Sequence, residues 1–530
     1  MWLSSTSGVH DHAVPPAAQS VYLETYGCQM NSSDSEVVLS ILAAAGFSQA
    51  QSPDAANVIL LNTCAIRDKA EERVWQRLRA LQHLRTRGAK RPVIGVLGCM
   101  AERLKGKLLE ADGLADVVAG PDAYRDLPNL LSLLRDGGGG GVMNVQLSAD
   151  ETYADIVPVR RHGATSAFLS IMRGCNNMCS FCIVPFTRGR ERSRPAASIL
   201  DEVRMLADEG VKEVTLLGQN VNSYACFSEP TRPTTPPTDG EGDTPRQPFA
   251  DYARGFTSVY VPKRTGAVRF GELLDRVAAI DPEMRIRFTS PHPKDFADDV
   301  FHAIAAHPNI CKQLHLPAQS GSSSMLERMR RGYTREAYLD LATRARALLP
   351  GVALSSDFIS GFCGETEAEH GDTISLMAAV QYEHAYMFAY SRRDKTHAAR
   401  HLEDDVPPET KQRRLEEVIA TFRTGAAKRA AADVGRVHCV LVEGPSKRST
   451  ADLCGRTDHG KMVVFPDVDV PATWADDRGP RVRLKPGDYV AVRVEKATAA
   501  SLTGAALART SLREFHEARR TAETNVAACV

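Results

Sequence analysis

The stretch Arg173-Gly-Cys-Asn-Asn-Met-Cys-Ser-Phe-Cys182 is the part of the sequence around which the remaining patterns are arranged. It follows an apolar, strand-like run, Ala167 to Met172, and spaces Cys175, Cys179 and Cys182 as C-x3-C-x2-C. A structural zinc ion takes four protein ligands, whereas a four-iron cluster on three cysteines keeps one iron open. The spacing favours such a cluster; a zinc site completed by a remote histidine, or a turn rich in thiols, stays an alternative.

Bulk composition sets wide bounds. A chain of 530 residues predicts several domains. Lys and Arg together number 65, as do Asp and Glu, so any nucleic-acid surface must be a local patch. Twelve cysteines in a chain of this length do not form a disulfide scaffold and suit a reducing compartment with a metal role. No apolar run is long enough to predict a membrane span.

Residues 20 to about 150 alternate strand-like and helical patterns. Four short apolar runs predict parallel strands: Val21 to Thr25, Val58 to Leu61, Val93 to Leu97 and Asp116 to Ala119. The intervening segments have helical periodicity, and Ser33 with Glu36 predicts a capping box at the start of the first helix. This order is typical of an open parallel α/β sheet.

Three cysteines follow the first three of these predicted strands. Cys28, Cys64 and Cys99 are 36 and 35 residues apart, about one βαβ unit each. Ligands collect at the carboxyl ends of parallel strands, so the three thiols are expected to share one sheet edge. The alternative is that they are ordinary buried thiols. The pattern therefore predicts a second three-cysteine set, again one ligand short for a four-iron cluster.

The two cysteine sets together resemble a known family. The C-x3-C-x2-C loop, with Phe181 before its third cysteine, is similar to the signature of radical S-adenosylmethionine (SAM) enzymes. With a cysteine triad ahead of it, the chain resembles the radical SAM methylthiotransferases of the MiaB type, closest to the eukaryotic, mitochondrial tRNA methylthiotransferases associated with a regulatory subunit of cyclin-dependent kinase 5. The stretches that carry the likeness are Tyr26-Gly-Cys-Gln-Met-Asn31, Leu61-Asn-Thr-Cys64, Pro185-Phe-Thr-Arg-Gly-Arg190, Leu216-Leu-Gly-Gln-Asn-Val221 and Met329-Arg-Arg-Gly-Tyr333.

Strand-like and helical runs also alternate from about residue 167 to 395, which predicts a partial or full barrel of parallel strands with its chemistry at their carboxyl ends. Polar residues follow several of these strands. By resemblance to radical SAM barrels they line the SAM pocket, and Phe181 packs against adenine. These predicted SAM contacts are Gly218, Gln219, Asn220, Ser290, Gln319 and Asp357. For Asp357, and for His292 after the third strand, the alternative is a capping or solvated role.

Two other parts of the central region stand out. Thr187 to Arg194 holds four arginines against one glutamate, which is either a solvated face or a phosphate contact for RNA, with Arg188 and Arg190 as the candidates. The segment from about 226 to 264 is rich in Pro, Thr, Gly and Asp and is expected to be a loosely packed insertion. Cys226 is assigned to that insertion and to no cluster.

Short alternating runs after Gly435 predict a small closed β-barrel, which resembles the RNA-binding TRAM domain. Lys447 and Arg448 are its candidate RNA contacts. A barrel that serves only for packing is the alternative. The expected domain order is an N-terminus without structure (1–19), the α/β domain (20–150), the radical SAM core (161–432), the TRAM barrel (433–510) and a tail (511–530).

The resemblance implies an activity. The cluster on Cys175, Cys179 and Cys182 cleaves one SAM, and the resulting radical takes the C2 hydrogen of an adenine. A second [4Fe-4S] cluster on Cys28, Cys64 and Cys99 carries the sulfur, which a second SAM methylates before it is inserted. The product is a methylthio group at C2 of N6-isopentenyladenosine next to the anticodon of tRNA. The expected partners are tRNA, SAM and an electron donor such as a reduced ferredoxin or flavodoxin-like protein, without a membrane.

Other functions are weighed beside this one. Relatives act on threonylcarbamoyl-adenosine or on a ribosomal-protein aspartate. A regulatory binding protein that acts on a kinase partner without catalysis belongs to a different class. Both cysteine sets are complete, which a binding protein does not need. The first twenty residues read as no transit or signal peptide. The likeness implies a mitochondrial location, with the cytoplasm as the alternative.

Overall fold

The computed structural model describes residues 19–65, 68–87, 91–111, 113–135, 141–160, 163–227, 254–257, 267–476 and 478–528. The expectation for residues 1–19 lies outside this range except at Gln19, and that for the insertion lies outside it apart from 226, 227 and 254–257. The chain forms two compact units. Unit 1 comprises residues 1–147 and 156–159, and unit 2 comprises 148–155 and 160–530.

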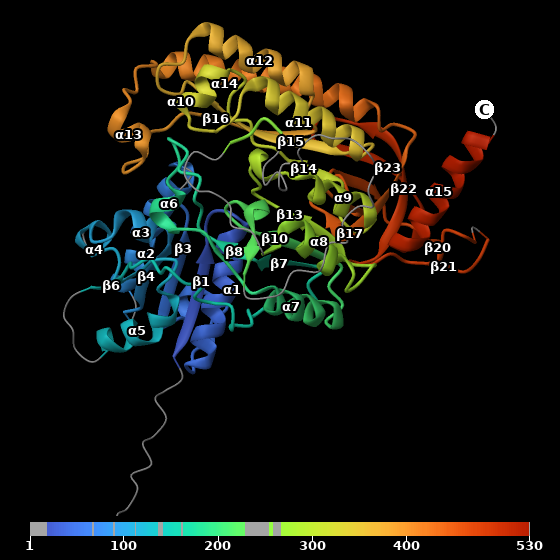
Figure 1. Cartoon of the computed structure of the whole chain (residues 1–530). Coiled ribbons are helices and arrows are strands. Elements are labelled where there is room, and N and C mark those ends of the chain that lie inside the picture. The colour runs from blue at the N-terminus through green and yellow to red at the C-terminus, as the bar shows by residue number, and fades with distance from the viewer. Residues whose placement is uncertain are drawn as a thin grey trace, which may run out of the picture. The chain divides into compact units, whose positions relative to one another are not determined.

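Unit 1 is an open, fully parallel sheet, drawn in blue to cyan in Figure 1, with strand order β2-β1-β3-β4-β5-β6. The prediction of a parallel α/β sheet is confirmed, and the short edge strands β2 and β6 were missed. Its strands are β1 Ser20–Thr25, β2 Ser48–Gln49, β3 Val58–Thr63, β4 Val93–Gly98, β5 Val117–Ala119 and β6 Val142–Asn144. Its helices are α1 Gln29–Ala44, η1 Pro53–Ala55, α2 Asp68–Arg87, α3 Cys99–Leu104, α4 Lys107–Glu110, η2 Tyr124–Asp126 and α5 Leu127–Arg135.

The central strand β3 is buried along its whole length, as a parallel strand covered on both faces should be. Its residues Ile59 and Leu61 pack with Val74 and Leu78 of α2 in one apolar cluster. Because side chains alternate along a strand, the intervening residues point to the other face. Burial on both sides fixes the register of β3, and with it the position of Cys64, the residue directly after the strand.

The expected capping box at Ser33 and Glu36 is wrong. Helix α1 starts at Gln29, with Cys28 as its N-cap, and Ser33 is buried in the second turn. Asn31 takes the N3 position, and its Oδ1 accepts from the backbone N–H of Cys28 at 3.3 Å. A cysteine and an asparagine thus occupy positions that the Ser/Thr-x-x-Glu pattern assigns to other residue types.

Unit 2 begins with six parallel strands, which confirms the predicted barrel in its partial form. Three strands pair as β7-β10-β13 and three as β14-β15-β16, and a parallel bridge between Ile286 and Ile310 links the two sheets. These strands are β7 Ser166–Ser170, β10 Glu213–Leu217, β13 Arg285–Phe288, β14 Gln313–His315, β15 Ala353–Ser360 and β16 His384–Ala389.

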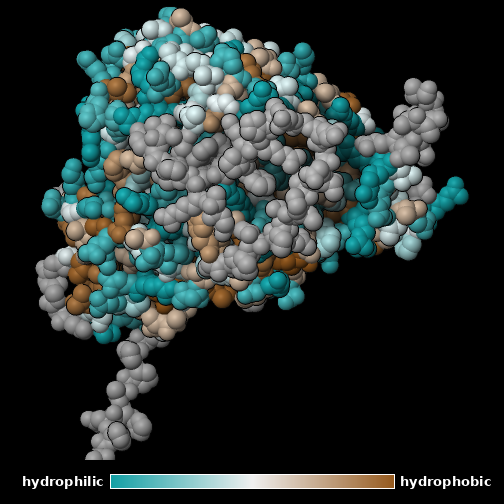
Figure 2. All heavy atoms as spheres, in the orientation of Figure 1, coloured by the Kyte–Doolittle hydropathy of each residue, from teal (hydrophilic) through white to brown (hydrophobic). Residues whose placement is uncertain are grey.

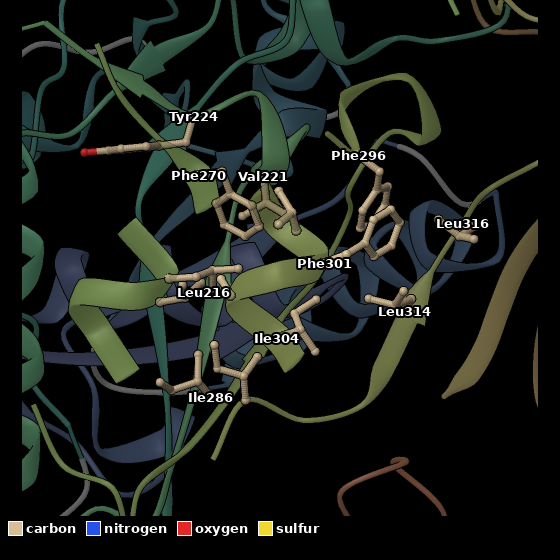
Figure 3. Packing of buried hydrophobic residues seen from close by; sticks show 14 of the residues in the cluster. Leu216, Val221, Tyr224, Phe270, Ile286, Phe296, Phe301, Ile304, Leu314 and Leu316 are labelled. Carbon is tan, nitrogen blue, oxygen red and sulfur yellow. The ribbon is translucent and has the colours of Figure 1, made fainter. Parts of the chain in front are cut away.

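Helices connect successive strands of the partial barrel and bury its outer face. They are α6 Val184–Thr187, α7 Ala196–Asp208, α8 Phe270–Ala278, α9 Asp298–Ala306, α10 Ser323–Arg328, α11 Arg335–Leu348, α12 Glu367–Val380, α13 His397–His401 and α14 Pro408–Ala431, with short turns η3 Val221–Ser223 and η4 Pro293–Asp295. Figure 3 shows the apolar interior, where Phe296 and Phe301 stack with ring centroids 5.6 Å apart beside Leu314 and Ile304.

Two small ribbons accompany the barrel. Strands β8 (Met172–Arg173) and β9 (Arg192–Ser193) pair antiparallel at the base of the C-x3-C-x2-C loop. Strands β11 (Ala225–Cys226) and β12 (Val268–Arg269) pair where the insertion leaves and rejoins the barrel. The assignment of Cys226 to the insertion is therefore wrong: it is a strand residue, 4% exposed in the main core. The insertion starts after it.

The last part of unit 2 is a closed β-barrel with order β17-β18-β19-β23-β22, as predicted. Its strands are β17 Val437–Ser446, β18 Ser449–Thr457, β19 Met462–Pro466, β22 Tyr489–Ala497 and β23 Ser501–Thr510, with a side ribbon β20 Val470–Pro471 and β21 Arg481–Val482 and a final helix α15 Leu512–Ala528.

This β-barrel packs on the amino-terminal end of the parallel strands. Arg285, the first residue of β13, donates to the carbonyls of Cys439 and Arg456 at 2.7 and 2.8 Å. Tyr489 donates to the carbonyls of Lys212 and Glu283, which precede β10 and β13. The β-barrel therefore does not cover the carboxyl ends of these strands, where the cysteine loop emerges and where the reaction is expected.

The described helices include none long and apolar enough to span a bilayer. On the face drawn in Figure 2, hydrophilic residues predominate and apolar residues form small groups.

Candidate active site

The C-x3-C-x2-C loop begins immediately after β8 and is held at Gly174. This glycine has φ +77°, and a Cβ built on it would lie 2.0 Å from the carbonyl oxygen of Arg190. Only glycine tolerates both conditions. The backbone N–H of Gly174 donates to the side-chain Oε1 of Gln219, so a residue predicted as a SAM contact orients the start of the loop.

The loop brings its three thiols together. Cys175 and Cys179 are buried and Cys182 is half-buried. Burial, with a smaller contribution from the neighbouring thiols, raises the pKa of Cys175 well above its ordinary value and that of Cys182 to about 12. At neutral pH these thiols are protonated in the free chain. They ligate as thiolates only where a cationic centre takes the place of their protons.

The spacing of the thiols bears on the choice between zinc and a cluster. In the described part of the chain, the one set of three Cys, His, Asp or Glu ligand atoms lying within 4.8 Å of one another is His438, Asp458 and His459. Neither cysteine trio is that tight. A single zinc ion with Zn–S bonds of about 2.3 Å would draw sulfurs closer. The C-x3-C-x2-C order fits a larger, multi-iron centre.

The set of His438, Asp458 and His459 has another explanation. It lies where the β-barrel meets β13. Burial raises the pKa of the half-buried Asp458, but neighbouring cationic groups, including Arg285 and Arg287, hold that pKa below its usual range. Arg287 also donates to the Asp458 carbonyl at 2.9 Å. The guanidinium groups of the buried Arg285 and the half-buried Arg287 offset the charge of this carboxylate, so the set belongs to the junction between the two parts of unit 2.

The residues expected to line the SAM pocket lie at the strand ends as predicted, but several are committed to the framework. A Cβ on Gly218 would meet the Met172 side chain at 2.6 Å, so this glycine is required for packing. Asn220 is buried and donates to Asp295 at 2.9 Å. His292 accepts from the backbone N–H of Lys294 and caps η4, which is the alternative role considered for it.

Three further pocket candidates remain at the carboxyl ends. Ser290 and Gln319 both have positive φ, +59° and +73°, a conformation that is uncommon for residues other than glycine. The Asp357 carboxylate on β15 lies 3.3 Å from His315 Nε2 on β14. Phe181 packs edge-on against Phe362, with ring centroids 6.4 Å apart, so one side of its ring is occupied by protein.

The arginine run after the loop is mostly internal. Arg188, Arg192 and Arg194 are 3 to 6% exposed, and Arg194 pairs with Glu202 at 2.7 Å. These three arginines are buried and so do not form a solvated face. They are also not phosphate contacts, because a phosphate contact requires an accessible guanidinium group. Arg190 alone of the four is exposed.

A basic pocket opens beside the loop. Its wall includes Cys179 and Cys182 together with Arg330, Lys395 and Arg400. His397 and His401 complete it with rings 4.6 Å apart, and the described lining contains no carboxylate. Arg330 and Lys395 both have positive φ. The pocket is suited to an anion. It could not be predicted from the sequence, because its lining residues come from three separate segments of the chain.

The second trio is assembled by the sheet of unit 1. Cys28 caps α1 after β1, Cys64 follows β3, and Cys99 begins α3 after β4. Strands β1, β3 and β4 are direct neighbours, with Thr25 opposite Asn62 and Thr63 opposite Gly98. A Cβ on Gly27 would lie 2.6 Å from the Cβ of Cys64. The expected common edge is present.

An amide pair, to which the sequence motifs assign no role, ties these strand ends together. Asn31 Nδ2 donates to the Thr63 carbonyl at 3.1 Å, and Asn62 Nδ2 donates to the Asn31 carbonyl at 2.9 Å. Asn31 Oδ1 lies 3.3 Å from the Cys28 Sγ. Both asparagines are fully buried. They lock the turn that carries Cys28 onto the strand that carries Cys64.

The remaining candidates lie apart from the trios. Lys447 and Arg448 are exposed in the hairpin between β17 and β18. Cys311 and Cys363 are buried outside both trios. Cys529 lies outside the described residues.

Comparison with known proteins agrees with this architecture. Residues 20–120 match the family described as uncharacterized protein family UPF0004, 169–377 the radical SAM superfamily and 431–507 the TRAM domain. A solved structure of the radical SAM methyltransferase TsrM from Kitasatospora setae, with cobalamin and a [4Fe-4S] cluster bound, has a TM-score of 0.51 at 15% identity over 72% of this chain and 77% of that one, and shows a shared fold.

The similarity to curated relatives is much closer. The rat mitochondrial tRNA methylthiotransferase CDK5RAP1 is 56% identical over 93% of this chain and 82% of its own length, and the human protein is 54% identical with the same coverage. The tRNA-2-methylthio-N(6)-dimethylallyladenosine synthase of Chloroherpeton thalassium is 48% identical over 94% of this chain and 98% of its own. The chain belongs to the radical SAM methylthiotransferase family.

Proposed function

We propose that this chain is an enzyme that places a methylthio group on C2 of N6-isopentenyladenosine next to the anticodon of tRNA, forming 2-methylthio-N6-isopentenyladenosine. The observation that carries the proposal is the pair of complete cysteine trios, one at the strand ends of unit 1 and one on the unit 2 loop. The names of the relatives, both bacterial synthase and mitochondrial methylthiotransferase, agree with that product.

Membership of the radical SAM superfamily brings a [4Fe-4S] cluster and SAM as cofactors. We assign this cluster to Cys175, Cys179 and Cys182, and a second [4Fe-4S] cluster to Cys28, Cys64 and Cys99. When bound, the first supplies the electron that cleaves SAM to a carbon radical and the second supplies the sulfur, since chemistry of this kind belongs to the cofactor and not to side-chain acids or bases.

The side chains around the loop then bind and orient. Gln219 sets the start of the cysteine loop through Gly174, and Asn220 and Gly218 hold the adjoining strand end in place. Ser290, Gln319 and Asp357 are left to contact polar groups of SAM. Phe181 offers its free side to the adenine ring.

RNA is contacted through phosphates. Arg190, Lys447 and Arg448 are exposed and take this role in the proposal, while the buried Arg188 no longer does. The basic pocket beside Cys182 adds Lys395 and Arg400, close to where the reacting base must enter. The electron donor is a reduced ferredoxin or flavodoxin-like protein, and the location proposed from the relatives is the mitochondrion.

Two cysteine variants test the scheme. Cys175→Ala abolishes SAM cleavage, whereas Cys64→Ala leaves cleavage intact and blocks methylthiolation. Both are measured on the full chain reconstituted with iron and sulfide under anaerobic conditions, with 5′-deoxyadenosine and the modified nucleoside as readouts. If both variants still form the product, the proposal is wrong.

Two further measurements separate the competing functions. The reconstituted chain is expected to hold about eight irons, four per cluster; a single colourless zinc would support a binding protein. Mass spectrometry of tRNA nucleosides from cells lacking the gene is expected to show loss of the isopentenyl methylthio product alone. Loss of the threonylcarbamoyl product, or of a modified ribosomal-protein aspartate, would move the assignment to that branch.

A further inference from the structure

The segment from Arg328, the last residue of α10, to Tyr333 forms hydrogen bonds to the cysteine loop. The backbone N–H of Ser180 donates to the Met329 carbonyl at 3.0 Å, and its hydroxyl donates to the Arg328 carbonyl at 2.9 Å. Ser180 is fully buried and lies between two of the loop cysteines. About 150 residues of sequence separate the two segments, so this contact is made only in the folded barrel.

Arg331 in this segment is aimed at one sulfur. Its Nη1 lies 3.3 Å from Cys179 Sγ, and its Nη2 donates to the Pro317 carbonyl at 2.7 Å. Its Nε donates to the hydroxyl of Tyr333 at 3.1 Å, and that hydroxyl donates onward to the Pro317 and Ala318 carbonyls. Only 4% of Arg331 is exposed. Two anchors, the Pro317 carbonyl and the Tyr333 hydroxyl, fix the guanidinium group against the thiol.

The charge of Arg331 needs a partner. Some other buried arginines of unit 2 meet carboxylates, as Arg414 does with Glu365 at 3.0 Å and Arg194 with Glu202 at 2.7 Å. Within the described residues, Arg331 contacts carbonyls, a phenol and one thiol, and no carboxylate. A buried cation without a counter-charge is strongly disfavoured. Among its contacts, the Cys179 sulfur carries a negative charge when it ligates a cluster, because cysteine binds metal as a thiolate.

We propose that Arg331 is a positioning residue that donates a charge-assisted hydrogen bond to the Cys179 thiolate and so raises the reduction potential of the cluster on Cys175, Cys179 and Cys182. The inference rests on the proposed cluster assignment. Hydrogen bonds to cluster sulfurs and nearby positive charge favour the reduced form, which carries one more negative charge. The couple takes up one electron, from dithionite or a low-potential electron-transfer protein, with no proton or bond change.

The test measures the potential directly. The full chain carries Cys28→Ala, Cys64→Ala and Cys99→Ala, so that the loop cluster is the only one, and midpoint potentials are read by dithionite titration followed by electron paramagnetic resonance. Arg331→Met is expected to shift the midpoint to more negative potential at unchanged iron content. Arg331→Lys keeps the positive charge but lacks the planar guanidinium fork, so it is expected to shift the midpoint less than Arg331→Met does. Arg335→Met, four residues on, whose guanidinium donates to the Gly321 carbonyl and Ser375, is the matched control and shifts nothing.

The outcomes separate the two proposals. If Arg331→Met binds iron fully and keeps the parent midpoint, the tuning role is wrong. If Arg331→Met loses iron, Arg331→Lys and Tyr333→Phe decide, because both leave the cysteines intact and each must move the midpoint in the negative direction. If adding Cys175→Ala leaves iron and signal unchanged, the cluster assignment itself fails.

Discussion

Each of the two cysteine trios brings three sulfurs together, and the two do so in opposite ways. Cys175, Cys179 and Cys182 lie within eight residues of one loop, whereas Cys28, Cys64 and Cys99 come from three strand ends 36 and 35 residues apart. The loop trio is held by contacts from distant segments, through Gln219, Ser180 and Arg331. The strand-end trio is held by the sheet register and the Asn31–Asn62 amide pair. The loop trio, whose cysteines are close in the sequence, is thus held by contacts from distant segments. The strand-end trio, whose cysteines are far apart in the sequence, is held by its own sheet and the amide pair.

The largest effects should come from glycines that allow each trio to form. Gly174→Ala places a Cβ 2.0 Å from the Arg190 carbonyl, and Gly27→Ala places one 2.5 Å from the Asn31 side chain, both at positive φ. Each variant is expected to lose its own cluster and keep the other, so that iron falls from about eight to about four per chain. Gly46→Ala, also at positive φ but in open space, is the control. Loss of all iron in either variant would contradict the independence of the trios.

Two thiols of the loop trio, Cys175 and Cys182, should be slow to react in the metal-free chain. Burial raises the pKa of Cys182 to about 12. Because a raised pKa leaves less thiolate at a given pH, alkylation at pH 8 should be about a thousandfold slower than for a thiol of pKa 9 and should rise with pH until the pKa is passed. Mass spectrometry of iodoacetamide-treated protein across pH 7 to 10 measures it, with the unfolded chain in denaturant as reference. A rate that levels off below pH 9 would contradict the shift.

Removal of the amide pair should weaken only the strand-end trio. Asn62→Ala leaves the Asn31 carbonyl and Ser35 hydroxyl without their buried donor, at a cost of about 1–3 kcal/mol. Urea denaturation of unit 1 followed by its own signal, such as Trp75 fluorescence, measures this. Asn57→Ala, whose partner Ser20 lies at the opposite end of the sheet, is the control for cluster loading. If Asn62→Ala and Asn57→Ala lost the same amount of iron, the amide pair would have no specific role in holding the strand-end trio.

The smallest expected effect concerns the basic pocket next to the loop trio. Lys395→Ala with Arg400→Ala should make RNA binding less dependent on salt, with the log-log slope smaller by about 0.7 for each phosphate that is no longer neutralised. Anticodon stem-loop RNA titrated at several salt concentrations measures the slope. Arg204→Ala, an exposed arginine paired with Asp201, should leave it unchanged. An unchanged slope in the double variant, or a weaker affinity for SAM in its place, would assign the pocket to another ligand.

The sequence predicted most of the fold because its strongest signals are local. Strands β3 and β4 are continuous apolar runs, and the thiols after them follow from βα alternation alone. The edge strands β2 and β6 were missed because two or three residues carry no periodicity. The capping box failed because the cap of α1 is a cysteine with its own function.

The charged residues were harder to predict. The run from Arg188 to Arg194 reads as surface, yet three of its arginines are buried because carboxylates and carbonyls from other segments receive them, as Glu202 does for Arg194. Charge counts give no information about such partners. The role of Arg331 was hidden for the same reason, since its sulfur partner is 152 residues away.

By itself, the sequence determined the order of domains, the two cysteine trios and the family, because spacing and hydrophobic period are properties of short segments. The tertiary structure alone decided which arginines are accessible, which predicted SAM contacts are needed for the framework, and which cation faces the Cys179 thiol. These depend on desolvation and on contacts between separate segments of the chain, from Arg194–Glu202 to Arg331–Cys179, and both exist only in the folded protein.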